Sequence, residues 1–465
     1  MASVEAYLES HRRTLTDLSD LIWSTPETSL RETASSRALM DLLASEGFEL
    51  QGVDSMPTAF VASFGRGSPV IALLGEYDAL PGLSQAPGIA EARPLAEGGA
   101  GHGCGHNLLG TASAAAAIAV AQAVREGKLR GTVRFYGCPA EETLVGKVFM
   151  AKAGLFDEVD CALTWHPGTT NAVWATSTQA MNSLRVRFRG TAAHAAANPE
   201  DGRSALDAVE LMDVGANFLR EHVPSNARIH YVITDGGDAP NVVPAHAEVW
   251  YYVRAPRRGE VEAISRRLLD VAQGAALMAG VTHEVELVTG CYDTLPNRTL
   301  GDLLQRQMEA LGAPRYSSGD HELARALQAT FPVDALGREL RQLRRRGLSL
   351  PPDCSLVETV APSYGYGEWD SGSTDVGDVS HLVPTAQITT VTAPLGTPGH
   401  SWQNVVAAGS AIGHRGMLYA AHVLARSACA LFEQPELIAQ AKEEFRQEAE
   451  PYVSPVRDLT GPPRG

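Results

Sequence analysis

The sequence predicts an α/β protein into which a second, smaller α+β domain is inserted. Over the first 180 residues, short apolar runs alternate with segments of helical periodicity, which is typical of a mostly parallel sheet flanked by helices. The order then changes to β-α-β-β-α-β before the first pattern returns. At 465 residues the chain is also too long for one typical domain. We therefore expect one domain built from residues 1–180 and 293–465, and a second domain at 181–292.

The elements of the first part follow from hydrophobic spacing. Residues 4–24 carry an apolar stripe at helical intervals, whereas the runs at 59–64 and 70–74 are continuous, apolar and bounded by Gly and Pro, as buried strands are. The predicted helices are 4–24, 33–45, 108–125 and 143–153, and the predicted strands are 59–64, 70–74, 132–136 and 161–165.

The inserted part has the split βαβ order of a ferredoxin-like sandwich. Its predicted strands are 184–188, 228–234, 248–254 and 283–288, and its predicted helices are 201–221 and 260–279. The α/β pattern then resumes with a strand at 387–391 and helices at 299–311, 404–427 and 434–449. The segment 313–384 is the least readable part of the chain.

The composition excludes several classes of partner. The formal net charge is −16, whereas nucleic acids and anionic membranes bind basic faces. The N-terminus lacks the apolar core of a signal peptide, and the most apolar run, 112–124, is too short to span a bilayer. Six scattered cysteines without a C-x-x-C pair fit a reducing compartment. We expect a cytoplasmic protein with no nucleic-acid or membrane partner.

The stretch G-H-G-C-G-H-N-L-L-G at 101–110 is the strongest chemical signal in the chain. It places His102, Cys104 and His106 at alternate positions, so an extended backbone would point all three side chains to one side. Two imidazoles and a thiolate on one side form a metal-binding arrangement. The alternative is a buried thiol flanked by two loop histidines.

Other polar residues follow predicted strands, where ligands bind in open parallel sheets. Each has a plainer explanation: the glutamate pair opens a helix, where the dipole favours carboxylates, and the others are compatible with turns. Their combination is more specific than any member, because a dinuclear metal site needs a bridging group, several terminal ligands and one free carboxylate that takes a proton from the attacking water. These residues are Glu76, Asp78, Glu141, Glu142, His166 and His400.

Several motifs together resemble a known enzyme family. They are G-E-Y-D-A-L-P-G at 75–82, G-H-G-C-G-H-N at 101–107, A-E-E at 140–142, W-H-P-G at 165–168, A-H-A-A-A-N-P at 193–199 and G-T-P-G-H at 396–400. The set is similar to the dinuclear amidohydrolases of the aminoacylase/carboxypeptidase metallopeptidase clan. Within it, the chain resembles the branch that holds the B subunit of p-aminobenzoyl-glutamate hydrolase and the indole-acetyl-amino-acid hydrolases. Asn107 and G-S-T-D-V-G-D at 372–378 favour the B-subunit group.

The resemblance implies a role for each site residue. The general base matches Glu141, and Asp78 matches a carboxylate that orients a ligand from behind. His102 matches no ligand, and Glu76 occupies a position where other branches have a ligand histidine, so both are left without a role. The metal ligands implied are Cys104, which bridges, together with His106, Glu142, His166 and His400.

The same resemblance makes residues 181–292 a lid and dimerisation domain. His194 matches a histidine that polarises the scissile carbonyl and that reaches the partner's site in relatives. Asn241 and Arg254 match positions that hold the substrate's α-carboxylate, for which the planar fork of Arg is suited. Without the resemblance, a strand-end ion pair for Arg254 and a plain loop position for His194 are the better interpretations.

The expected function is hydrolysis of an amide bond between an acyl or aroyl group and an amino acid. The expected cofactors are two divalent metal ions per subunit, Zn or Mn. The expected partners are a small N-acyl amino acid and a second copy of the chain in a homodimer or higher homo-oligomer, with a homologous second subunit as a further option. Two alternatives stay open: a subunit or binding protein without independent hydrolysis, and a hydrolase of a non-peptide C–N bond such as a carbamoyl group.

Overall fold

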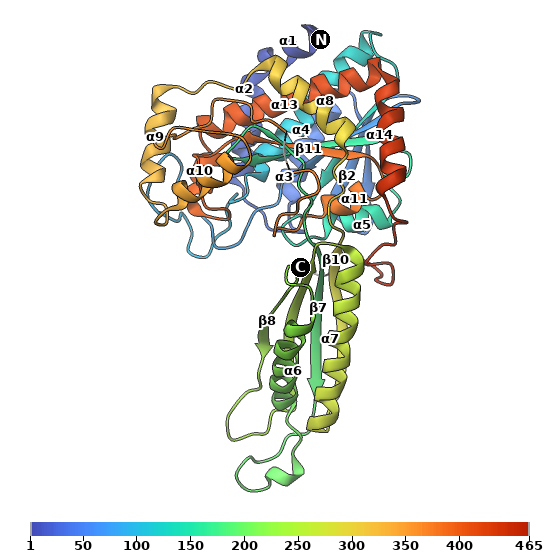
Figure 1. The fold of residues 1–465 in the computed structure, drawn as a ribbon, viewed down its shortest axis with the longest axis vertical. Helices are drawn as coiled ribbons and strands as arrows, with labels where there is room; N and C mark the ends of the chain where they lie inside the picture. Colours follow the sequence, from blue (N-terminus) through green and yellow to red (C-terminus); the bar gives the residue numbers. More distant parts are fainter. Residues whose placement is uncertain (1, 364, 464–465) are drawn as a thin grey trace.

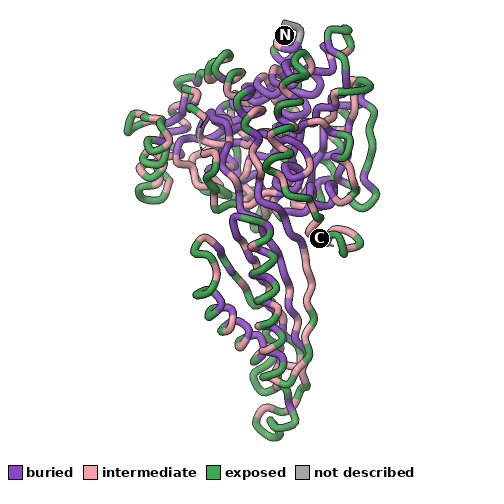
Figure 2. The backbone as a smooth tube through the Cα atoms, turned by 45° about the vertical axis from the view of Figure 1, so that its right-hand side comes forward, coloured by how far each residue is buried: buried purple, intermediate pink, exposed green. Residues whose placement is uncertain are grey.

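The computed structural model describes residues 2–363 and 365–463. The chain forms a broad α/β body from which a narrow, elongated domain projects (Figure 1). Buried backbone is concentrated in the body, while the projecting domain exposes much of its length (Figure 2). The fold class expected from the sequence is confirmed, because the body has a mostly parallel central sheet with helices on both faces and the projecting domain is a small antiparallel α+β unit.

The body is organised around a seven-stranded sheet in the order β1-β2-β4-β3-β5-β11-β6. The four central strands, β4, β3, β5 and β11, run parallel, and the outer strands are antiparallel to their neighbours. The strands are β1 (Glu49–Val53), β2 (Met56–Gly65), β3 (Val70–Glu76), β4 (Thr132–Cys138), β5 (Cys161–Gly168), β6 (Ala172–Trp174) and β11 (Thr385–Val391).

Successive residues of the central strands serve two different cores. In β3, Ile71 and Leu73 pack into one apolar cluster, while Ala72 and Leu74 pack into another. The first cluster contains α1 (Ala2–Ser10), α2 (Arg12–Ser24), α3 (Thr33–Ser45), α4 (His106–Arg125), α8 (Arg298–Leu311), α13 (Ala411–Glu433) and α14 (Pro435–Glu448). The second contains α5 (Gly146–Lys152) and α11 (Val376–Ser380). A continuous apolar run in β3 is therefore explained by burial on both faces.

Helix α4 is the central helix of the body. It is long and apolar enough to pass a composition test for a membrane span, but 89% of that apolar window is buried inside the protein. Its alanine-rich surface lets it approach β3 closely: a Cβ placed on Gly110 would lie 2.6 Å from the backbone oxygen of Glu76. This close approach fixes the distance between the end of β3 and the first turns of α4.

The projecting domain is inserted between β6 and α8. Its strands are β7 (Ala180–Arg189), β8 (Arg228–Asp235), β9 (His246–Ala255) and β10 (Thr282–Cys291), paired antiparallel in the order β10-β7-β9-β8. Helices α6 (Ala205–Leu219) and α7 (Arg258–Ala279) pack on one face of this sheet and close a separate apolar core. This is the ferredoxin-like arrangement expected for the insertion.

The structure differs from the predicted elements in four places. The predicted helix 4–24 is broken at His11 into α1 and α2, and the predicted helix 404–427 is broken after Gly409 into α12 (Trp402–Ala408) and α13, where the Ser410 hydroxyl accepts from the backbone N–H of Ile412. Strands β1 and β6 were not predicted, because β1 is exposed along most of its length and β6 has only three residues. The segment 313–384 contains α9 (Ser318–Gln328) and α10 (Ala335–Arg345).

The contact between α4 and β3 predicts that alanine, normally the better helix former, destabilises the protein at position 110. We expect Gly110→Ala to lower the free energy of unfolding by roughly 1–3 kcal/mol, because the added Cβ would overlap the Glu76 carbonyl. Gly274 in α7 is the matched control, since no atom lies within 4 Å of a Cβ built there. Gly274→Ala should stabilise the protein by about 0.5–1 kcal/mol. Urea unfolding of both variants measures the difference, and a stabilised Gly110→Ala variant would contradict the packing described.

Candidate metal centre

Polar side chains from four parallel strands meet at one edge of the body sheet. The central strands end there because parallel neighbours share their carboxyl edge. The loop before α4 reaches the same place. The residues brought together are Glu76 and Asp78 at the end of β3, Glu141 and Glu142 after β4, His166 in β5, His400 after β11, and Cys104 and His106 at the start of α4.

The segment 101–105 turns instead of running extended, which corrects the first interpretation of its three alternating side chains. Gly105 has a φ of 78°, and α4 begins at His106. The turn still brings Cys104 and His106 together. His102 points elsewhere: its Nε2 lies 3.1 Å from the backbone oxygen of Ile22, and burial lowers its pKa to about 4. The expectation that all three side chains share one site is therefore wrong for His102.

The two ring nitrogens of His106 differ in their contacts: Nδ1 is hydrogen-bonded, and Nε2 is not, within the described part of the chain. Its Nδ1 lies 2.9 Å from Oδ1 of Asp78, and Oδ2 of Asp78 accepts from the Ser29 hydroxyl at 3.0 Å and from the backbone N–H of Glu142 at 2.9 Å. The opposite nitrogen, Nε2, is buried without a hydrogen-bond partner among the described residues. Oε2 of Glu76 lies 3.3 Å from this Nε2. A histidine fixed by a carboxylate on one nitrogen, with the other nitrogen facing possible metal ligands, is the usual form of a metal ligand.

Cys104 belongs to two groups of possible ligands. In one, its Sγ lies with His106 and His166, and in the other with Glu142 and His400; the ligand atoms of each group are all within 4.8 Å of one another. The distance from Cys104 Sγ to His166 Nε2 is 3.3 Å, and Glu142 Oε2 is 3.4 Å from His400 Nε2. One thiol shared by two ligand groups is the arrangement expected of a residue that bridges two cations.

The protonation behaviour of the cluster indicates a missing positive charge. Burial, together with the charges of Glu76, Asp375 and Glu142, raises the pKa of Glu141 well above its usual value. Burial also raises the pKa of Glu142 to about 7 and that of the Cys104 thiol to about 12. Oε2 of Glu76 and Oε1 of Glu142 are buried without hydrogen-bond partners among the described residues, and the His106 imidazole lies 3.3 Å and 4.0 Å from them, respectively. Divalent cations would remove both problems, so the donor set fits a metal centre.

A buried lysine that the sequence analysis overlooked lies beneath the cluster. The ammonium group of Lys147 is 2.7 Å from Oε1 of Glu76 and 2.5 Å from Oδ1 of Asp375, and all three side chains are buried. Burial opposes its charge, but Asp375 and Glu76 hold the Lys147 pKa well above its usual value. In the sequence, the only signal is a lysine that directly precedes the apolar residues of α5, a helix that ends in a second lysine, Lys152.

A cavity of about 300 Å³ opens over the cluster. Cys104, Glu141, His166 and His400 line it, and so does Arg254 from the end of β9. Arg254 donates to the Ser373 hydroxyl at 3.3 Å, while its Nε is buried without a partner among the described residues. The cavity thus combines a candidate metal centre with a guanidinium group that belongs to the inserted domain.

His194 and Asn241 lie outside this cavity. They are neighbours of each other, because His194 forms a bridge with Val242 and the Asn241 carbonyl accepts from the Ala195 N–H at 3.0 Å. Both are exposed. They belong to the loops after β7 and after β8, at the end of the inserted domain that is farthest from the body (Figure 1). Within one chain, the structure therefore brings Arg254 to the cluster but not His194 or Asn241.

Two further buried residues near the body sheet, Asn107 and His381, have structural partners. The Asn107 side chain is buried and donates to the Ser19 hydroxyl at 3.0 Å and to the Ala408 carbonyl at 3.3 Å, which ties α4 to α2 and α12. His381 is buried against Tyr292, with Nε2 3.8 Å from Asp293. Tyr364, in the aromatic loop after residue 362, lies outside the described residues.

Comparison with known proteins gives a consistent group of relatives. A family model described as "Peptidase family M20/M25/M40" matches residues 72–353. The chain is 44% identical to the B subunit of p-aminobenzoyl-glutamate hydrolase from Escherichia coli, over 97% of this chain and 96% of that protein. It is 32% identical to the A subunit of the same hydrolase over 54% of this chain and 59% of that protein. Among solved structures, a dinuclear metal-binding peptidase of Bacillus subtilis shares the fold, with a TM-score of 0.56 and 18% identity over 90% of this chain and 98% of that chain.

The buried ion pairs of Lys147 lead to a stability prediction. We expect Lys147→Met to lower the free energy of unfolding by about 3–5 kcal/mol, because it leaves Glu76 and Asp375 buried without a cation. Lys128→Met is the control, since it removes an exposed ion pair with Glu126 and should change stability little. Chemical denaturation measures both variants. Equal stability of Lys147→Met and the wild-type protein would show that the pairs contribute nothing.

Proposed function

Because the chain belongs to the peptidase family M20/M25/M40, we propose that it is a metal-dependent amidohydrolase that cleaves the amide bond between an acyl or aroyl group and an amino acid. The observation that carries this proposal is the Cys104 thiol, which two groups of possible metal ligands share at the floor of a cavity. The relatives support the substrate class, since one is a subunit of a p-aminobenzoyl-glutamate hydrolase.

The proposed centre holds two divalent cations. Cys104 would serve both cations, with His106 and His166 as ligands of one and Glu142 and His400 as ligands of the other. Thiolate and imidazole ligands suit zinc, and the carboxylate also allows manganese. When bound, such cations polarise the amide carbonyl and make water more acidic. Asp78 keeps His106 in the tautomer whose Nε2 is free to bind.

Glu141 is the proposed general base. It lines the cavity beside the cluster, and its Oε2 is 4.0 Å from His106 Nε2, so the carboxylate lies next to the open ring nitrogen of a proposed ligand. In this role it takes a proton from the attacking water and passes it to the nitrogen of the departing amino acid. Arg254 holds the α-carboxylate of that amino acid by paired hydrogen bonds.

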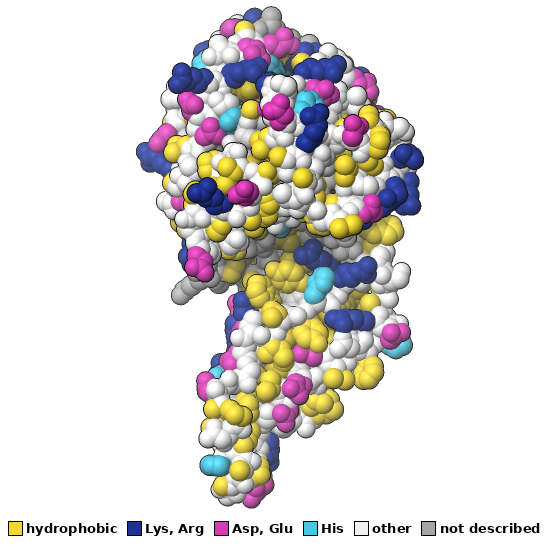
Figure 3. All heavy atoms as spheres, turned by 90° about the vertical axis from the view of Figure 1, so that its left-hand side faces the viewer, with side chains coloured by type: hydrophobic (Ala, Val, Ile, Leu, Met, Phe, Trp, Pro, Cys, Tyr) yellow, Lys and Arg dark blue, Asp and Glu magenta, His cyan; other side chains and the backbone are white. Residues whose placement is uncertain are grey.

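We further propose a homodimer in which His194 and Asn241 of one protomer complete the cavity of the other. Both are exposed and far from their own chain's cluster, although the family resemblance assigns them to substrate. The inserted domain also carries exposed apolar side chains on its edge strand β8 and on α6, and apolar side chains gather on the face seen in Figure 3. The residues concerned are Val214, Phe218, Val232 and Ile233. An unpaired strand edge with apolar neighbours is suited to pairing with a second copy.

The role of Glu141 is tested by an isosteric change. We expect Glu141→Gln to keep the fold and the metal content while kcat falls by roughly 10²–10⁴-fold, since proton transfer is lost but no proposed ligand is removed. The measurements are turnover of N-acyl amino acids and metal analysis of the same preparation. Near wild-type turnover would refute the mechanism. Product analysis also separates the alternative reaction, because a carbamoyl substrate would release ammonia and carbon dioxide.

Sharing of residues between protomers is tested by mixing two inactive variants. His194→Ala and Glu141→Gln should each be inactive alone. After subunit exchange, an equimolar mixture should regain about one quarter of wild-type activity, because half of the dimers are then mixed and each mixed dimer has one intact site of two. Sedimentation of the wild-type chain checks the dimer itself. No recovery in mixed dimers would place both residues in one protomer's site or exclude His194 from the reaction. Activity of the wild-type chain alone would remove the need for a homologous second subunit.

A further inference from the structure

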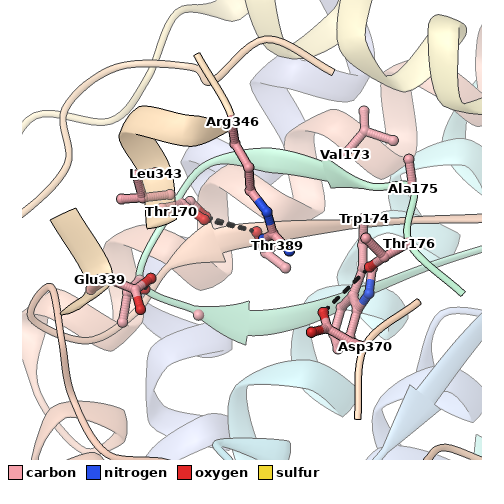
Figure 4. Close-up of a pocket in the computed structure, with 12 residues that line it drawn as sticks. Thr170, Val173, Trp174, Ala175, Thr176, Glu339, Leu343, Arg346, Asp370 and Thr389 are labelled. Atoms are coloured by element: carbon pink, nitrogen blue, oxygen red, sulfur yellow. Dashed lines mark hydrogen bonds between the residues drawn. The ribbon is translucent and has the colours of Figure 1, made fainter. Parts of the chain in front are cut away.

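A second cavity lies beside the one over the metal centre. Its volume is about 190 Å³, and β6, α10 and the loop around residue 370 enclose it (Figure 4). Figure 4 shows Glu339 and Asp370 on opposite sides of this cavity. Neither Glu339 nor Asp370 has a role in the reaction proposed above.

The two cavities are neighbours separated by the side chain of Trp174, which lines both. The same three segments of the chain line both cavities. In each segment, the residue that lines one cavity is two positions away from the residue that lines the other. Thr178, Gly372 and Gln387 line the metal-centre cavity, and Thr176, Asp370 and Thr389 line the second one. In extended chain, two residues correspond to about 7 Å, so a substituted phenyl ring or a short alkyl chain can reach from one cavity to the other.

The lining of the second cavity is rich in hydrogen-bond acceptors. Oε1 of Glu339 receives a long hydrogen bond of 3.4 Å from the Thr169 hydroxyl, and Oδ2 of Asp370 receives one of 3.4 Å from Thr176. Both carboxylates are half-buried. Arg346 also lines the cavity, so that two carboxylates stand against one guanidinium group. Such a lining favours a ligand that donates N–H groups or carries positive charge.

From this arrangement we propose that the second cavity is a subsite for the acyl half of the substrate, and that Glu339 and Asp370 select an amino group at the far end of that half. The inference rests on the proposed function, in which Arg254 holds the amino-acid half. The other half of the substrate, the acyl group, is therefore the part that extends past Trp174. Trp174 then lies against the substrate between the scissile carbonyl and the distal amino group.

The test compares acyl groups of matched size on glutamate with the metal-loaded enzyme. The aromatic pair is 4-aminobenzoyl and 4-methylbenzoyl, and the aliphatic pair is 5-aminopentanoyl and hexanoyl, which distinguishes a neutral arylamine from an ammonium group. We expect the amino member of at least one pair to have a kcat/KM roughly tenfold higher, mainly through KM, as one hydrogen bond to a charged group provides. The pair that shows the preference tells whether the cavity binds a neutral arylamine or an ammonium group.

The variants are Glu339→Gln, Asp370→Asn and the two combined. We expect each to reduce the preference for the amino substrate, and the double variant to abolish it. Glu368→Gln is the control, because Glu368 is exposed in the same loop and lines a different cavity. It should leave the preference intact.

The outcomes separate the two proposals. Hydrolysis of the methyl substrates with no preference for an amino group in either pair overturns the subsite while the amidohydrolase function stands. A preference that survives in the double variant also overturns it. If no substrate of either pair is hydrolysed by the metal-loaded wild-type enzyme, the amidohydrolase proposal fails and the subsite fails with it.

Discussion

The structure depends on the compensation of negative charge that is buried at one edge of a sheet. Four carboxylates lie there almost without solvent, and only one buried ammonium group, that of Lys147, faces them within the described part of the chain. Lys147 pairs with Glu76 and Asp375, whereas the basic group beside Asp78 and Glu141 is the imidazole of His106. The remaining charge calls for divalent cations, which thiolate and imidazole groups are placed to hold. The four carboxylates are Glu76, Asp78, Glu141 and Asp375.

The two ends of the inserted domain differ in their relation to this centre. The end of β9 brings Arg254 directly into the cavity of its own chain, where it contacts Ser373. The opposite end exposes His194 and Asn241, which do not line that cavity. One antiparallel sheet links the two ends. A movement of this domain relative to the body would therefore displace Arg254 in the cavity together with the loops that carry His194 and Asn241.

Much of this arrangement is readable in the sequence, because buried strands appear as apolar runs and parallel strands bring their ends together. That logic assembles Asp78, Glu142 and His166 from distant positions. It fails where tertiary contacts decide: Lys147 looks like a surface residue of a short helix, and the turn at Gly105 removes His102 from the cluster. The cavity beyond Trp174 was also unpredictable, since α10 comes from the stretch with the weakest pattern. Local spacing cannot report which distant segment covers a side chain.

The pairing of Lys147 with Asp375 has a consequence for how the protein is made. The two residues are separated by 228 positions, and β11, the strand that completes the parallel set, likewise pairs with β5 from the far side of the insertion. A ribosome thus releases β3, β4 and β5 long before their last neighbour exists. Until then, the nascent chain exposes an unpaired β5 edge and a lysine without one of its counter-ions. Such long-range strand pairing favours slow folding of the body and assistance by chaperones during synthesis. The inserted domain has its own sheet and core, so it can fold before the body is complete.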